Sequence, residues 1–136
     1  MEKAIANQRS FRSEQWKMLL ITMFCYLFFY TGRHNFGWAV KDMATDLGIN
    51  YTSVGWISFS MLIGYAIGQL VNGNLADRYS PRKMIALGAI LSVSANFAIS
   101  LSSTYWIILI LWAMNGYFQA MAWAPGGRLI SNWWAR

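Results

Sequence analysis

The sequence predicts an all-α polytopic membrane protein. Of its 136 residues, 57% are hydrophobic and only 12% are charged, whereas a soluble domain carries about 25% charged residues. Trp, Tyr and Phe contribute 8, 7 and 8 residues, and such aromatic side chains gather at the two interfaces of a bilayer. Apolar stretches of membrane-spanning length, about 20 residues, recur along the chain. Together these features exclude an ordinary soluble domain.

We predict four transmembrane helices, at about 16–40, 53–75, 83–101 and 105–131. Residues 1–15 are polar and basic and are interpreted as a cytoplasmic N-terminal tail. The apolar stretch that follows is too long for the core of a signal peptide, and no small-residue cleavage site comes after it. The chain is therefore divided into this tail and one four-helix transmembrane portion over 16–136.

Local signals mark where the helices begin and end. Gly48 suits the C-terminal end of the first helix, and Thr52 or Ser53 could cap the second. Pro81 suits the first position of the third helix. Pro125 lies within the fourth span, where proline predicts a kink.

The distribution of Lys and Arg predicts that both termini lie in the cytoplasm, because cytoplasmic connections are enriched in these residues. The connection between the first two spans balances Lys41 against Asp42 and Asp46, and the connection at 102–104 is uncharged. The basic residues gather in the tail, in the second connection and at the end of the chain: Lys3, Arg9, Arg12, Lys17, Arg78, Arg82, Lys83, Arg128 and Arg136.

Arg33 is a charged residue inside the first predicted span. A charge within a spanning helix costs about 2.5–3.5 kcal/mol on insertion scales, so such residues usually face a polar cavity. Helical spacing puts Tyr26 and Tyr30 on the same face, and a guanidinium beside phenol hydroxyls can bind carboxylate or phosphate oxygens in pairs. One alternative stays open. Arg33 lies about 26 Å along the helix from Trp16, so it could instead reach lipid headgroups.

Two other spans also carry polar residues at helical spacing. The second span has Tyr65, Gln69 and Asn72, and the fourth has Trp112, Asn115 and Gln119. Tyr65, Gln69 and Gln119 join Arg33, Tyr26 and Tyr30 as candidate substrate-binding residues. Hydrogen bonding between helices is the alternative for these side chains, and it is favoured for Gln69, Asn72 and Asn115.

Small and weakly polar residues are interpreted as packing residues. Gly64 and Gly68 form a small-xxx-small pair suited to close helix approach. In the third span Ser92, Ser94 and Asn96 are assigned to packing as well.

Several function classes find no support in the sequence. No Asp or Glu lies within a predicted span, and no metal-ligand spacing, phosphate-binding glycine loop or nucleophile–base pair is present. We therefore expect no enzyme, no cofactor and no metal. The net charge is +6, but the basic residues fall between the apolar runs, so nucleic acid is not an expected partner. The expected partners are the lipid bilayer and a small anionic substrate.

The segment from Gly73 to Lys83 resembles the G-x-x-x-D-R-x-x-x-R-[RK] signature of the major facilitator superfamily of transporters. It stands at the matching place, between the second and third helices. The resemblance implies that Asp77, Arg78 and Arg82 contribute to charge contacts that close the cytoplasmic face. A turn carrying ordinary cytoplasmic basic residues is the alternative.

A narrower resemblance covers the rest of the chain. Residues 115–128 and the tryptophan pair at 133–134 are similar to the NG-x-x-Q-x-x-GWPP-x-x-R…WW stretch of the organophosphate:phosphate antiporters, and the first span has their tyrosine pair followed by arginine. The resemblance implies exchange of glycerol 3-phosphate or sugar phosphates for inorganic phosphate, with Arg33 binding the phosphate group. Gln69 departs from the family, which usually has lysine there, whereas Tyr65 is kept. Ala122 and Ala124 are milder departures.

The resemblance implies twelve helices in two six-helix halves, so the four helices here correspond to the first four of one half. We expect a fragment that needs eight further helices as its partner and does not transport alone, in a bacterial inner membrane with a cytoplasmic N-terminus. An anion:cation symporter for carboxylates such as hexuronates is the main alternative, because Gln69 suits it better. A non-transporting membrane interaction protein is a remote one. A small drug exporter would need an intramembrane carboxylate, which the spans lack.

Overall fold

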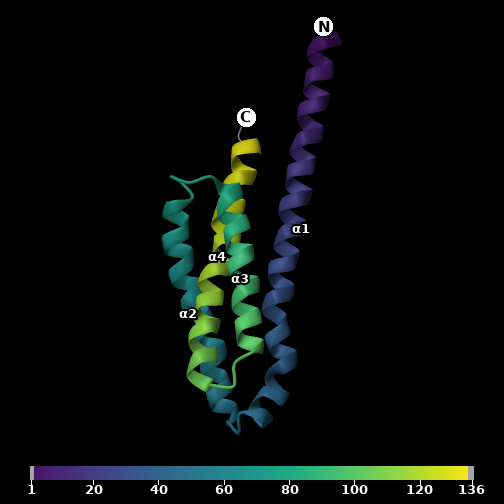
Figure 1. Ribbon diagram of the computed structural model, residues 1–136. Coiled ribbons are helices and arrows are strands. Elements are labelled where there is room, and N and C mark those ends of the chain that lie inside the picture. Colours follow the sequence, from purple (N-terminus) through teal and green to yellow (C-terminus); the bar gives the residue numbers. More distant parts are fainter. Residues whose placement is uncertain (1, 135–136) are drawn as a thin grey trace.

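The computed structural model is a bundle of four helices without strands in the described part of the chain, residues 2–134 (Figure 1). Its side chains are described for Gln8 and for 10–134, so the predictions on Lys3, Arg9 and Arg136 lie outside the described residues. The predicted all-α class is confirmed. The helices are α1 (Glu2–Asp46), α2 (Tyr51–Leu75), α3 (Pro81–Ser100) and α4 (Tyr105–Trp134).

Helix α1 is longer than the predicted span. It runs for 45 residues and takes in the segment that the sequence analysis separated as a tail. That segment contains Glu, Lys, Ala, Gln and Arg and no Gly or Pro, so nothing in it interrupts a helix. The N-terminal turns of α1 extend beyond the other helices (Figure 1). At the other end Gly48 has φ 60°, the left-handed conformation that terminates helices, as predicted.

The cap of α2 differs from the prediction. Asn50, not Thr52 or Ser53, is the capping residue, and its Oδ1 accepts hydrogen bonds from Ser53 N (2.8 Å) and Ser53 Oγ (3.0 Å). Asn50 has the extended backbone that a capping residue needs, while Ser53 is already helical. Pro81 begins α3 as predicted. Pro125 is fully buried inside α4, and the helix continues beyond it to Trp134.

Helix α4 is central and packs most extensively against α2 and α3, whereas α1 contacts it much less. Glycines allow this close approach. A Cβ on Gly64 would collide with the carbonyl of Ala113, and a Cβ on Gly116 with the carbonyl of Met61. Gly68 repeats the arrangement one turn on, where a Cβ would lie 2.6 Å from Ala120 Cβ. The prediction that Gly64 and Gly68 serve close packing is confirmed.

Three helices of the described chain, α2, α3 and α4, are long and apolar enough to cross a membrane. Helix α1 is not among them, because Lys17 and the polar run from Arg33 to Asn35 flank its apolar stretch and lower its hydropathy. The N-terminus, the C-terminus and the α2–α3 connection all lie at one end of the bundle (Figure 1). A buried apolar cluster closes the opposite end, where Phe36 stacks on Trp112 at 4.6 Å between ring centroids.

Candidate functional site

Three helices meet at the guanidinium of Arg33. Arg33 Nε donates a hydrogen bond to Gln119 Oε1 of α4 at 3.0 Å. Its Cζ lies 4.5 Å from the ring centroid of Tyr65 in α2 and 5.4 Å from that of Tyr30 in α1. Distances under about 6 Å are those of cation–π contacts. The half-buried side chain is thus directed at α2 and α4, which is not the arrangement of an arginine that reaches out to lipid headgroups.

Aromatic rings extend this site along α1. Tyr26 and Tyr30 pack edge to face with centroids 5.1 Å apart, and Tyr26 lies 5.5 Å from Trp123 of α4. The structure therefore brings Tyr26, Tyr30 and Tyr65 together around Arg33. Trp123 was not among the predicted site residues. Only the similarity of its surrounding segment to a transporter motif pointed to it, because spacing within α1 says nothing about which α4 residue faces Tyr26.

The two glutamines occupy different environments. Gln119 is buried, with 3% of its surface exposed, and it contacts Arg33 directly. Gln69 lies one helical turn from Tyr65, and its Nε2 is buried without a hydrogen-bond partner among the described residues. Asn72 donates to the carbonyl of Tyr117 across the α2–α4 contact at 3.4 Å, the interhelical role expected for it. Gln69 thus offers a donor that an added acceptor could use.

Polar contacts continue behind Gln119 into the α3–α4 interface. Ser92 Oγ donates to Asn115 Oδ1 at 2.6 Å, and Gln119 Nε2 donates to Ser92 Oγ at 3.5 Å. The sequence analysis assigned Ser92 to packing and favoured interhelical bonding for Asn115. The structure agrees with both assignments, but the sequence analysis did not predict that Ser92 and Asn115 connect to Arg33 through Gln119. The available signal was that Asn115 and Gln119 lie four residues apart on one face of α4.

The residues of the signature loop lie away from this site. Asp77 forms an ion pair with Arg128 of α4, a partner that the sequence analysis did not assign to it. Arg78 and Arg82 are exposed. At Gly73 an added Cβ would meet no atom within 4 Å, so packing within the described chain does not require glycine there.

We expect the Asp77–Arg128 ion pair to contribute little to stability, because both side chains are about half exposed, at 58% and 45%. Asp77→Asn should lower the free energy of unfolding by less than about 1 kcal/mol. Unfolding in mixed detergent micelles, followed by circular dichroism, measures this. The exchanged pair, Asp77→Arg with Arg128→Asp, is the control and should behave like the original. A loss well above 1 kcal/mol would mean that Asp77 holds the loop through further contacts.

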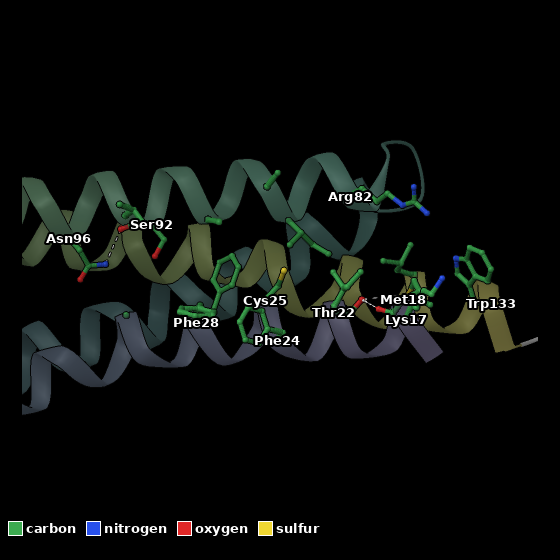
Figure 2. A pocket seen from close by; sticks show the side chains of 18 of the residues that line it. Lys17, Met18, Thr22, Phe24, Cys25, Phe28, Arg82, Ser92, Asn96 and Trp133 are labelled. Atoms are coloured by element: carbon green, nitrogen blue, oxygen red, sulfur yellow. Dashed lines mark hydrogen bonds between the residues drawn. The ribbon is translucent and has the colours of Figure 1, made fainter. Parts of the chain in front are cut away.

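A large cavity adjoins the polar contacts behind Gln119, because Ser92 lines it. It has a volume of about 900 Å³ and lies between α1, α3 and α4. Figure 2 shows Lys17, Arg82 and Trp133 at one end, Ser92 and Asn96 toward the other, and mostly apolar side chains between them. Arg33 does not line it. Because its wall is mainly apolar, this cavity does not suit a small anion as the Arg33 site does.

The Arg33 site is composed of hydrogen-bond donors. It combines one guanidinium with phenol rings and amide groups, which donate hydrogen bonds to anionic oxygens. No group of three His, Cys, Asp or Glu side chains that could hold a metal ion occurs in the described chain. The arrangement suits reversible binding of one anionic group.

Proteins with similar sequences include transporters of phosphorylated compounds. The probable hexose phosphate transport protein of Chlamydia trachomatis is 34% identical over 123 residues, covering 89% of this chain and 27% of that protein. The phosphoglycerate transporter protein of Salmonella typhimurium is 36% identical over 118 residues, covering 87% and 26%. The glycerol-3-phosphate transporter of Bacillus subtilis is 30% identical over 114 residues, covering 81% and 26%. No match was found among solved structures.

The chain spans about a quarter of the length of these relatives. Its similarity to transporters of phosphorylated compounds confirms the resemblance to the organophosphate:phosphate antiporters. The sequence profile of the Major Facilitator Superfamily matches residues 22–136, which is most of the chain. The protein therefore belongs to the major facilitator superfamily.

Proposed function

We propose that this chain takes part in secondary active transport of a small organic anion, preferably a sugar phosphate or glycerol phosphate, in exchange for inorganic phosphate. One observation carries the proposal. The Arg33 guanidinium is held inside the bundle by Gln119 and Tyr65, and among the described residues its hydrogen bond is made by Nε alone. Its two terminal nitrogens remain for a solute, and a planar guanidinium matches phosphate or carboxylate oxygens in pairs.

The surroundings strengthen such binding. Charge-assisted hydrogen bonds are short and about twice as strong as neutral ones. Tyr26 and Tyr30 add phenol hydroxyls to the site, Tyr65 adds its ring, and Gln69 adds an unpartnered amide donor. Alternating access requires two bundles that rock about a shared site. The chain would supply one side of that site, and eight further helices would supply the rest.

We further propose that both termini face the cytoplasm of a bacterial inner membrane. The shared end of the bundle, which holds both termini and the α2–α3 connection with Arg78 and Arg82, supports this orientation (Figure 1). By the same proposal the exposed residues Arg78 and Arg82, with Asp77, take part in closing the cytoplasmic face.

A second candidate is transport of a carboxylate, such as a hexuronate, together with a cation. One observation favours it. Gln69 stands where the phosphate exchangers usually have lysine, so Arg33 is the single positive charge in the described site. One cation balances a carboxylate more closely than it balances a doubly charged phosphate ester.

A chimeric transporter tests both candidates. The segment of the Bacillus subtilis glycerol-3-phosphate transporter that matches this chain is replaced by the chain itself, and uptake into phosphate-loaded proteoliposomes is measured. We expect glycerol 3-phosphate uptake that depends on internal phosphate. Hexuronate uptake that is independent of phosphate would favour the second candidate. A chimera that reaches the membrane at normal levels, binds neither solute and transports neither would contradict both.

Tyr65 allows the contribution of its ring to be separated from that of its hydroxyl. In the chimera Tyr65→Phe keeps the ring 4.5 Å from the guanidinium, and we expect KM for glycerol 3-phosphate to change little. Tyr65→Leu removes a cation–π contact of about 1 kcal/mol, so KM should rise about fivefold. An equal rise of KM in both variants would show that the hydroxyl, not the ring, matters, and an unchanged KM in both would show that Tyr65 does not contribute.

A further inference from the structure

We propose that Ser92 and Asn115 are positioning residues that act through Gln119 to hold the Arg33 guanidinium toward the solute. Four side chains form a continuous series of hydrogen bonds. Arg33 Nε donates to Gln119 Oε1 at 3.0 Å, Gln119 Nε2 donates to Ser92 Oγ at 3.5 Å, and Ser92 Oγ donates to Asn115 Oδ1 at 2.6 Å. This inference rests on the proposed function, because it explains how the anion-binding group is oriented.

The two hydrogen bonds of Gln119 have only one possible direction. A guanidinium donates hydrogen bonds and cannot accept them, so Gln119 must present its oxygen to Arg33. The nitrogen of the same amide then faces Ser92, which must accept with its oxygen. The single proton of the Ser92 hydroxyl is left for Asn115 Oδ1. Gln119 therefore meets complementary partners on both sides only in the observed orientation, whereas Asn115 Nδ2 is buried without a partner among the described residues.

Burial makes this orientation difficult to change. The exposed fractions are 6% for Ser92, 0% for Asn115 and 3% for Gln119. A buried polar group that loses its partner bears the full cost of desolvation. Close helix packing also holds the Ser92 end of the series. At Gly88, one turn from Ser92, an added Cβ would lie only 2.7 Å from Met121 Cβ of α4. The series is thus anchored where α3 and α4 are in close contact.

The consequence is a defined geometry of binding. Nε already donates its hydrogen bond to Gln119. The edge of the guanidinium formed by Nε and the adjacent terminal nitrogen therefore has only one donor left for an anion. The remaining pair of donors is formed by the two terminal nitrogens. The ring of Tyr65, 4.5 Å from Cζ, limits rotation of the guanidinium plane. An anion should therefore bind end-on, with two oxygens facing the two terminal nitrogens.

The test observes Arg33 directly in the 136-residue chain, reconstituted in lipid nanodiscs with ¹⁵N-labelled arginine. Arg33→Lys identifies the Nε–H signal of Arg33 by its disappearance. We expect Ser92→Ala to speed exchange of this proton with water about fivefold, the effect of losing one hydrogen bond. Ser92→Thr retains the hydroxyl and should restore slow exchange.

Ser94→Ala is the matched control, because Ser94 is exposed and bonds only within its own helix, to Ile90 O at 2.9 Å. It should leave the Arg33 signal unchanged. Should Ser92→Ala prevent folding, Asn115→Ala removes the acceptor at the other end and should give the same faster exchange. Unchanged exchange in a folded variant, or faster exchange that Ser92→Thr fails to restore, would overturn the proposal.

Titration of the chimera, which supplies the remaining helices of the site, with inorganic phosphate separates this inference from the proposed function. A phosphate-dependent shift of the Arg33 signal that weakens in Ser92→Ala supports both. If phosphate causes no shift while Ser92→Ala still speeds exchange, the hydrogen-bonded series orients Arg33 as proposed. In that case it is the anion-binding function that fails.

Discussion

Replacing Arg33 with lysine in the chimeric transporter should lower kcat/KM for glycerol 3-phosphate at least about tenfold, because a lysine ammonium cannot bind two oxygens in one plane. Lysine also lacks the Nε–H group with which Arg33 donates to Gln119 Oε1 at 3.0 Å, so the orientation that this bond sets is lost. Uptake by proteoliposomes over a range of solute concentrations measures the change.

Arg12→Lys is the control for this prediction, since Arg12 is an exposed arginine on the same helix. It should leave uptake unchanged. If Arg33→Lys retains normal uptake at a normal membrane level, Arg33 does not bind the substrate, and a role in helix association alone would account for it.

Replacing Gly64 with alanine should disrupt the α2–α4 contact. The added Cβ would collide with the carbonyl of Ala113, and a helix backbone cannot shift as a flexible side chain can. Overpacking of this kind typically costs about 1–3 kcal/mol, and more where the obstacle is rigid. We expect the free energy of unfolding to fall by about 3 kcal/mol or more, measured in mixed micelles by circular dichroism.

Gly55→Ala provides the matched control in the same helix, because a Cβ there meets no atom within 4 Å. Alanine is the better helix former, so this variant should be stabilised by about 0.5–1 kcal/mol. Equal stability of the two variants would show that α2 and α4 are farther apart than the structure places them.

The sequence predicted the helices to different degrees for identifiable reasons. Helices α2, α3 and α4 were located within two or three residues at each end, since long apolar runs bounded by polar connections define them. The start of α1 was not predicted. The residues before Trp16 are polar but favour helix, and hydropathy reveals only the apolar stretch that follows them. Likewise Asn50 and Ser53 are both plausible caps by residue type, and only backbone geometry distinguishes them.

The candidate site shows a similar division. Helical spacing grouped Tyr26, Tyr30 and Arg33 on one face of α1, and the structure places two other predicted residues, Gln119 and Tyr65, opposite them. Spacing within one helix says nothing about which residue of another helix lies opposite.

Contacts between distant segments depend on how the helices pack, and the sequence alone does not give that packing. The Asp77–Arg128 ion pair, the proximity of Trp123 to Tyr26, and the Ser92–Asn115 hydrogen bond therefore became visible only in the structure.

The central claim is that Arg33 lies in a water-accessible site and binds the anionic group of the solute. Its most direct test is modification of the chimera by phenylglyoxal, a water-soluble reagent for arginine, with the modified residues identified by mass spectrometry. We predict that Arg33 reacts, and that saturating glycerol 3-phosphate strongly slows its reaction while leaving Arg12 unaffected. Reaction at Arg33 that glycerol 3-phosphate does not slow, or the absence of any reaction there, would contradict the claim.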